Sequence, residues 1–156
     1  MKLNKKGFTL VELLAVIVVL AVIMVIAIPT VIDSMNSAKK SSFAMYGQKM
    51  LNAAMSKVQG DALDGKPAKA KYKFSELVAA SGQYKGYVSY TSSTNTYKVH
   101  FYNTDYMANG ASYDELEAWK KANCSGATLP SECNKFLNST DSGWGTAKTA
   151  IDNELK

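Results

Sequence analysis

An unbroken apolar run near the N-terminus constrains the fold of this chain more than any other feature. The run extends from Phe8 to Ile28, which is 21 residues, and Glu12 is the one charged residue in it. As an α-helix it would measure about 31 Å, close to the thickness of the hydrocarbon core of a bilayer. The run excludes a wholly soluble protein, and the polar remainder of the 156 residues argues against a multi-span membrane protein.

The residues that flank the run predict its orientation. Three lysines, Lys2, Lys5 and Lys6, precede it. Positive charge at this end favours a cytoplasmic N-terminus, which places the larger C-terminal part outside. No small-residue cleavage site of the ordinary secretory kind follows Ile28. We therefore expect an N-terminal membrane anchor.

Glu12 does not fit a simple anchor. A carboxylate in the hydrocarbon costs about 2.5–3.5 kcal/mol on insertion scales. No lysine lies between Gly7 and Lys39, so we expect nothing within the segment to compensate this charge. The expected partner is the chain's own terminus, another subunit or another protein. The alternative is a Glu12 near the interface whose carboxylate reaches water.

The residues around Glu12 carry a resemblance to a known family. A short basic leader ends at Gly7, the aromatic Phe8 follows, Glu12 comes four positions later, and the apolar helix after it carries Pro29. This pattern resembles the class III signal of type IV pilins and related pseudopilins. We expect an α+β fold, in which a long N-terminal helix packs on a small antiparallel sheet with short helices.

The resemblance also implies how the chain is divided and processed. It gives a leader at 1–7, a transmembrane and filament-core helix at 8–32, and an extracellular head at 33–156 that includes an amphipathic half-helix at 33–59. A membrane protease would cut between Gly7 and Phe8, and the new Phe8 amine would be N-methylated and stay cationic. Glu12 would meet that amine on a neighbouring subunit, and Pro29 would lie in a stretch that can extend in the filament.

The function that the resemblance implies is that of a structural subunit. The chain would assemble with its own copies into a type IV pilus for adhesion, motility or biofilm formation, helped by a prepilin peptidase and N-methyltransferase, an assembly ATPase and a membrane platform protein. The prepilin would sit in the cytoplasmic membrane before it reaches the cell surface. Two alternatives remain open. One is a pseudopilin of a type II secretion or DNA-uptake system, and the other is a minor tip pilin or adhesin.

Composition argues against other classes of function. All 18 basic residues are lysines and the net charge is +5, so the arginine forks that read bases and phosphates are missing and we expect no specific nucleic acid partner. No GxxxxGK[ST] loop and no histidine cluster is present, so we expect neither an enzyme nor a cofactor. The lack of arginine also favours an AT-rich genome, and with the resemblance a low-GC Gram-positive host.

Periodicity and turn signals predict the elements of the head. Ser112 and Glu115 form a capping-box pattern. We expect a hairpin of 84–91 and 96–103, a further strand that cannot be placed, and a loop at 60–73. Helices are expected at 8–59, 76–80, 112–122, 131–137 and 146–155; Gly60 would end the first of them and Ser75 would cap the second.

Three further groups of residues could carry chemistry. The lysines of 66–73 could contact DNA or an acidic surface, although a solvated loop is the simpler expectation. His100, the single histidine, is predicted to be a surface strand residue. Cys124 and Cys133 enclose eight residues, and two cysteines this close outside the membrane most often form a disulfide. Many pilins have a C-terminal disulfide loop, whereas some lack it. A zinc site would need two further ligands.

Overall fold

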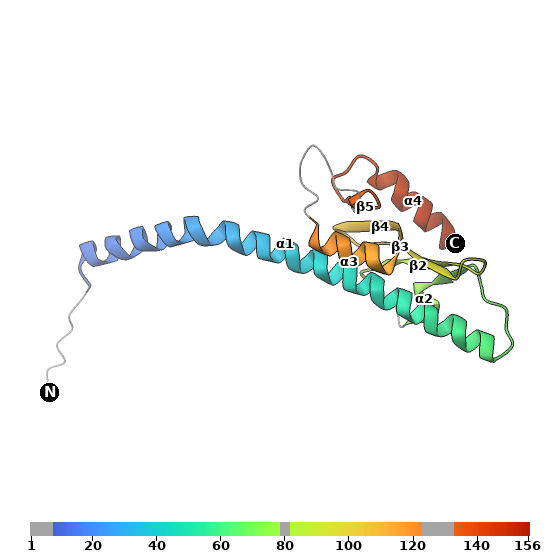
Figure 1. Ribbon diagram of the computed structural model, residues 1–156. Helices are drawn as coiled ribbons and strands as arrows, with labels where there is room; N and C mark the ends of the chain where they lie inside the picture. The colour runs from blue at the N-terminus through green and yellow to red at the C-terminus, as the bar shows by residue number, and fades with distance from the viewer. Residues whose placement is uncertain (1–7, 79–81, 123–132) are drawn as a thin grey trace, which may run out of the picture. The chain divides into compact units, whose positions relative to one another are not determined.

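The computed structural model describes residues 8–78, 82–122 and 133–156 (Figure 1). Its contacts divide the chain into two compact units, Met1–Lys39 and Lys40–Lys156. One long helix, α1 (Leu10–Leu63), contributes to both units. The second unit adds a five-stranded antiparallel sheet and short helices, so the fold is α+β, as predicted.

Helix α1 begins and ends a few residues later than predicted. Gly60 lies inside it, so the prediction that this glycine ends the helix is wrong. An ion pair at i,i+4 supports the last turn, in which Lys57 Nζ lies 2.8 Å from the carboxylate of the buried Asp61. Gly65 follows the helix with a φ of 71°, a left-handed conformation that glycine adopts without steric cost.

The sheet has the order β1-β2-β3-β4-β5, which is also the order along the chain. Its strands are β1 (Lys71–Lys73), β2 (Lys85–Thr91), β3 (Thr96–Tyr102), β4 (Tyr106–Ala111) and β5 (Phe136–Asn138). The predicted hairpin is confirmed as β2 and β3, which are closed by the pair Thr91 and Thr96. The strand that the sequence did not place is β4 beside β3, and short edge strands complete the sheet on both sides.

Both edge strands lie where the sequence predicts another structure. The loop predicted at 60–73 contains β1, which pairs with β2. The helix predicted at 131–137 is wrong, because Phe136–Asn138 is β5 and pairs with β4; residues 131 and 132 lie outside the described residues. The Phe136 ring stacks on Trp119 with 4.5 Å between centroids. Side-chain packing and strand pairing therefore decide the conformation of this segment.

The short helices follow local signals to different degrees. The capping box of α3 (Tyr113–Lys121) is confirmed, because Ser112 N donates to Glu115 Oε2 at 2.8 Å and Glu115 N donates to Ser112 Oγ at 3.3 Å. Helix α4 (Trp144–Glu154) begins two residues before its predicted start. Helix α2 (Phe74–Leu77) contains Ser75 within it, so the prediction that Ser75 caps this helix is wrong.

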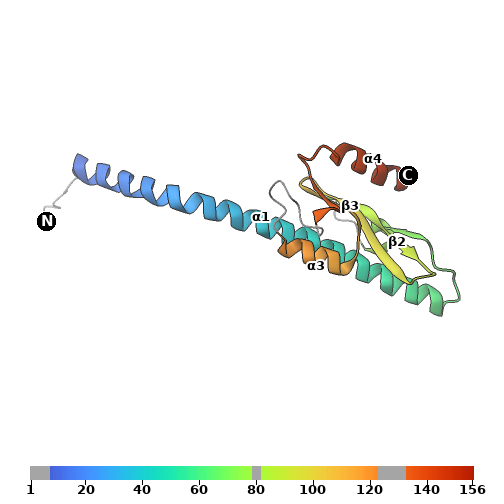
Figure 2. The same ribbon diagram turned by 45° about the horizontal axis from the view of Figure 1, so that its top comes forward.

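Helices cover both faces of the sheet within the second unit (Figures 1 and 2). Successive residues of one strand point to opposite faces, so Phe101 joins the core under α1 and α3 while Tyr102 joins a second core under α4. The first core includes Phe43, Met50 and Leu51 of α1. The second consists of Tyr87, Tyr102, Met107 and Ile151. The C-terminal helix is thus an integral layer of the head.

Strands β2 and β3 leave no room for a side chain at Gly86 in β2. A Cβ there would lie 2.3 Å from the carbonyl oxygen of His100 and 2.4 Å from Phe101 Cβ. We expect Gly86→Ala to destabilise the head by at least about 3 kcal/mol, because the contact is with backbone that cannot rotate away. Thermal unfolding of the full chain in detergent, followed by near-UV circular dichroism, measures this loss.

Gly60→Ala is the matched control for that substitution. A Cβ at Gly60 meets nothing within 4 Å, and the residue lies inside α1. Alanine is favoured over glycine in a helix by up to about 1 kcal/mol, so this variant should be as stable as the parent or slightly more stable. A Gly86→Ala protein that melts with the parent would show that the strands can separate at this point at little cost.

Candidate assembly and processing site

The start of α1 is organised by two residues, Thr9 and Glu12. Thr9 N donates to Glu12 Oε2 at 2.8 Å, and the Thr9 hydroxyl donates to the same oxygen at 2.9 Å. In return Glu12 N donates to Thr9 Oγ1 at 3.3 Å. This reciprocal arrangement is a capping box, which satisfies backbone donors that a helix start leaves without intrahelical partners.

The capping box corrects one expectation about Glu12. We expected no compensating group within the segment, but Thr9 supplies two neutral donors to the carboxylate. Neutral donors hold the carboxylate in place without cancelling its charge, so a cation is still required in an apolar medium. Sequence inspection missed the role of Thr9, although Thr-x-x-Glu before an apolar run is itself the signal.

Phe8 is the residue next to this box and lies outside the helix. Its side chain is 90% exposed, and Phe8 and Thr9 both have non-helical backbone. Gly7, the predicted residue on the other side of the cut, lies outside the described residues. The predicted new terminus, Phe8, thus lies outside the helix, four positions before Glu12, whose carboxylate Thr9 orients.

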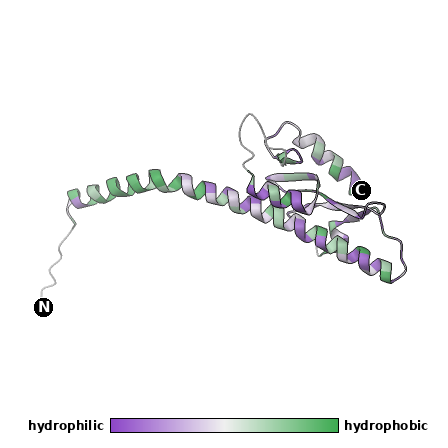
Figure 3. Cartoon of the chain, in the orientation of Figure 1, coloured by the Kyte–Doolittle hydropathy of each residue, from purple (hydrophilic) through white to green (hydrophobic). Residues whose placement is uncertain are grey.

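The rest of the first unit is a bare apolar helix. Every residue from 8 to 39 is exposed, and the hydrophobic colour predominates in the N-terminal part of α1 after its first turn (Figure 3). In length and composition α1 is a candidate to cross a membrane, and it is the one such helix among the described residues. Bare leucine, isoleucine and valine side chains need lipid or other apolar helices around them, because water solvates them poorly.

Pro29 lies inside α1, as the sequence predicts. The helix continues on both sides of it, although a proline cannot donate a backbone hydrogen bond to the carbonyl four residues earlier. The next residue, Thr30, donates its hydroxyl to the carbonyl of Ala27 at 2.8 Å. The helix therefore has one backbone bond fewer at this point, which is a local weakness within an otherwise regular element.

The predicted disulfide lies partly outside the described residues. Cys133 is 2% exposed and is a disulfide-bonded residue. Cys124 falls in the range 123–132, which the structure does not describe, so its pairing with Cys133 stays a prediction. Cys133 comes shortly before β5, whose partner is β4. A bond there would fasten the segment before the edge strand.

We expect the bond between Cys124 and Cys133 to stabilise the head by about 2–3 kcal/mol, the loop-entropy value for a loop of about ten residues. Thermal melts of the full chain in detergent, with and without reductant, measure this difference. Mass spectrometry after alkylation is the control. Labelling of both cysteines without prior reduction would contradict the bond.

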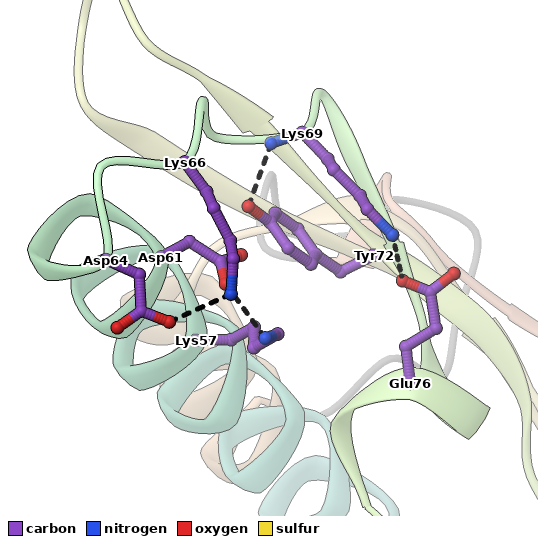
Figure 4. Close-up of polar contacts among 7 residues, drawn as sticks. All are labelled: Lys57, Asp61, Asp64, Lys66, Lys69, Tyr72 and Glu76. Carbon is purple, nitrogen blue, oxygen red and sulfur yellow. Dashed lines mark hydrogen bonds and ion pairs between the residues drawn. The ribbon is translucent and has the colours of Figure 1, made fainter.

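The lysines of 66–73 do not form an open basic surface. Three of them pair with carboxylates and the fourth, Lys73, donates to a backbone carbonyl; Figure 4 shows the pairs of Lys66 and Lys69. The contacts are Lys66 to Asp64 at 2.9 Å, Lys69 to Glu76 at 3.0 Å, Lys71 to Glu154, and Lys73 Nζ to the carbonyl of Leu155 at 2.6 Å. A carboxylate therefore lies beside three of these four lysines.

His100 lies on the sheet, half-buried beside Tyr87, with 4.7 Å between the ring centroids. Its Nδ1 is 2.8 Å from Asn109 Oδ1 and its Nε2 is 3.2 Å from Ser89 Oγ. Burial lowers its pKa, because an imidazolium is poorly solvated there. Ser89 sits in mid-strand between its paired residues on both sides, so the group bridges β2, β3 and β4 as a structural contact.

Comparison with known proteins concerns the N-terminal segment that contains Thr9 and Glu12. Residues 2–28 match the family model described as the prokaryotic N-terminal methylation motif. No curated protein and no solved structure matched the chain. The matched segment contains the leader lysines, Gly7, Phe8, the capping box and most of the bare helix.

Proposed function

We propose that this chain is a structural subunit of a type IV pilus, in which the N-terminal helices of many copies form the filament core and the second unit forms the surface. The methylation motif matched by residues 2–28 is a type IV pilin-like signal, and it overlaps the apolar part of α1. The observation that carries the proposal is that the motif overlaps the first part of α1, where every residue from 8 to 39 is exposed. Such a helix is stable in lipid first and among its own copies afterwards.

Processing would begin at the peptide bond between Gly7 and Phe8. A prepilin peptidase would hydrolyse it on the cytoplasmic side, which removes Lys2, Lys5 and Lys6 and leaves an amine on Phe8. Methylation of that amine keeps it cationic. The cut also removes the charges that hold the leader at the inner surface, so the apolar helix can leave the membrane in one direction.

Assembly would then depend on pairing between subunits. The Glu12 carboxylate, oriented by Thr9, would accept the cationic amine of Phe8 on a neighbouring chain. A charge left unpaired in an apolar core is costly, whereas a paired one is tolerated, so this contact can set the register of the helices. An assembly ATPase and a membrane platform protein would drive the extraction. The local weakness at Pro29 would let α1 extend as it packs.

Immunogold electron microscopy of intact cells tests the proposal. Labelling along whole filaments is expected for a major subunit, and cells that lack the gene should lose the filaments. Sparse or tip labelling would instead assign the chain to a minor pilin. Filaments seen only when a secretion or DNA-uptake apparatus is overproduced would assign it to a pseudopilus.

A further inference from the structure

A hollow of about 450 Å³ opens on the face of the head that α4 covers, and no role in filament assembly uses it. The first turns of α4 form one wall, the end of β3 forms the floor, and the segment that leads into β2 forms the other wall. Its lining includes Gln83, Lys85, Tyr102, Asn103, Trp144 and Lys148. The volume falls in the range of small-molecule sites, which is roughly 300–1,000 Å³.

Two aromatic side chains give the hollow a fixed apolar surface. Tyr102 is 7% exposed, and the half-buried Trp144 meets it edge-on with 6.5 Å between centroids. The Tyr102 hydroxyl donates to Asp152 Oδ1 at 2.5 Å, which ties the floor to α4. Tyr102 belongs to the second core and Trp144 packs against it, so the tryptophan is held in place before any ligand arrives.

The charges around the hollow leave one cation in excess. Lys148 Nζ lies 3.0 Å from Asp152 Oδ2. The Tyr102 hydroxyl, this lysine and, through its charge alone, Lys85 hold the pKa of Asp152 below its usual value. The acid and Lys148 therefore cancel. Lys85 is exposed, and no hydrogen bond or ion pair engages its ammonium among the residues that the structure describes.

The neutral polar group nearest the floor offers donors. Asn103 Oδ1 already accepts the backbone N–H groups of Asp105 at 2.9 Å and Tyr106 at 2.7 Å. Its amide NH₂ is what remains to bind a ligand. The indole N–H of Trp144 is a further donor, and no hydrogen bond engages it within the part of the chain that the structure describes. The hollow thus combines an aromatic wall, an excess of donors and a single uncompensated positive charge.

We propose that this hollow binds a saccharide that carries a carboxylate, such as a hexuronic or a sialic acid. The C–H face of the sugar ring would lie on Trp144, the carboxylate would pair with Lys85, and ring hydroxyls would accept from Asn103. One unpaired lysine balances the single charge of a carboxylate. A phosphate carries up to two charges and is met best by arginine forks, which this chain lacks. The site is independent of how the filament assembles.

Ligand-observed NMR with the full chain in a sugar-free detergent tests the proposal. The probes are glucuronate and N-acetylneuraminate, with glucose, acetate and inorganic phosphate as comparisons. We expect saturable binding of at least one acidic sugar at millimolar concentrations, and weaker binding of glucose, which lacks the charge, and of acetate, which lacks the ring. Comparing glucuronate with N-acetylneuraminate shows whether the hollow prefers a hexuronic acid or a sialic acid.

Variants locate the binding. Lys85→Gln should weaken it about tenfold, a typical value for losing a charge-assisted hydrogen bond, and Trp144→Leu should abolish the ring contact while keeping an apolar side chain over the second core. Lys98→Gln is the matched control, because this exposed lysine of β3 lies outside the lining. Circular dichroism verifies that each variant is folded.

Several outcomes would overturn the proposal. These are the lack of saturable binding by either acidic sugar, equal binding of glucose, tighter binding of inorganic phosphate, or an equal loss in Lys98→Gln and Lys85→Gln. If a folded Trp144→Leu protein binds the sugar as the parent does, the ring does not contact Trp144 and the proposed site is wrong.

Discussion

Glu12→Val subunits should be cut normally and accumulate in the membrane, but they should form few or no filaments. Valine makes the segment a better membrane helix, so a plain anchor would keep or improve its function. In a filament the amine on Phe8 would lose its counter-charge in an apolar core, which costs about 3–5 kcal/mol for each unpaired charge by the precedent of buried pairs. Membrane fractionation and electron microscopy, in cells without the wild-type subunit, measure both results.

The capping box calls for a second variant, because Glu12→Val removes the N-cap bonds of Thr9 together with the charge. Glu12→Gln separates the two effects. A glutamine oxygen can still accept from Thr9, as glutamine does in capping boxes, but it carries no charge. If charge pairing sets the register, Glu12→Gln also fails to assemble. Abundant filaments of normal length from Glu12→Gln subunits would assign the role of this residue to the cap alone.

The sequence predicted the two elements with strong local signals and misjudged those whose partners are distant. Ser112 and Glu115 were identified as a capping box, and the hairpin of β2 and β3 follows from alternating residues around a turn. Thr9 and Glu12 have the same spacing, but the apolar run around Glu12 draws attention to its charge and hides its role in the cap. The lesson is that one residue can serve helix capping and assembly together.

The short edge strands could not be found by pattern. β1 and β5 have three residues each, too few for an alternation to emerge, and β1 is rich in lysine. Each exists because a longer strand beside it offers unpaired backbone groups. The hollow near Trp144 was equally hidden, since its walls come from three segments that are far apart in the chain. Such sites depend on tertiary packing.

The second large effect concerns the leader. Gly7→Leu should leave all seven leader residues on the chain, so that mass spectrometry of the membrane protein finds the intact N-terminus without a methyl group on Phe8. The reason is steric. Glycine lets the backbone enter a tight protease site, and a leucine side chain beside the scissile bond fills that space. Phe8 and Thr9 have non-helical backbone, so we expect no helical hydrogen bond on that side to hinder the cut, and the block should come from the side chain at position 7.

Asn4→Leu is the control for this variant, because it adds the same side chain to the leader three residues before the cut. It should be processed normally. Loss of the cut in Gly7→Leu also removes the amine on Phe8, so Glu12 loses its proposed partner and filaments should disappear as they do in Glu12→Val. The two variants then fail at different steps, one with the leader attached and one without it. Normal removal of the leader from Gly7→Leu chains would refute the assignment of the cleavage site between Gly7 and Phe8.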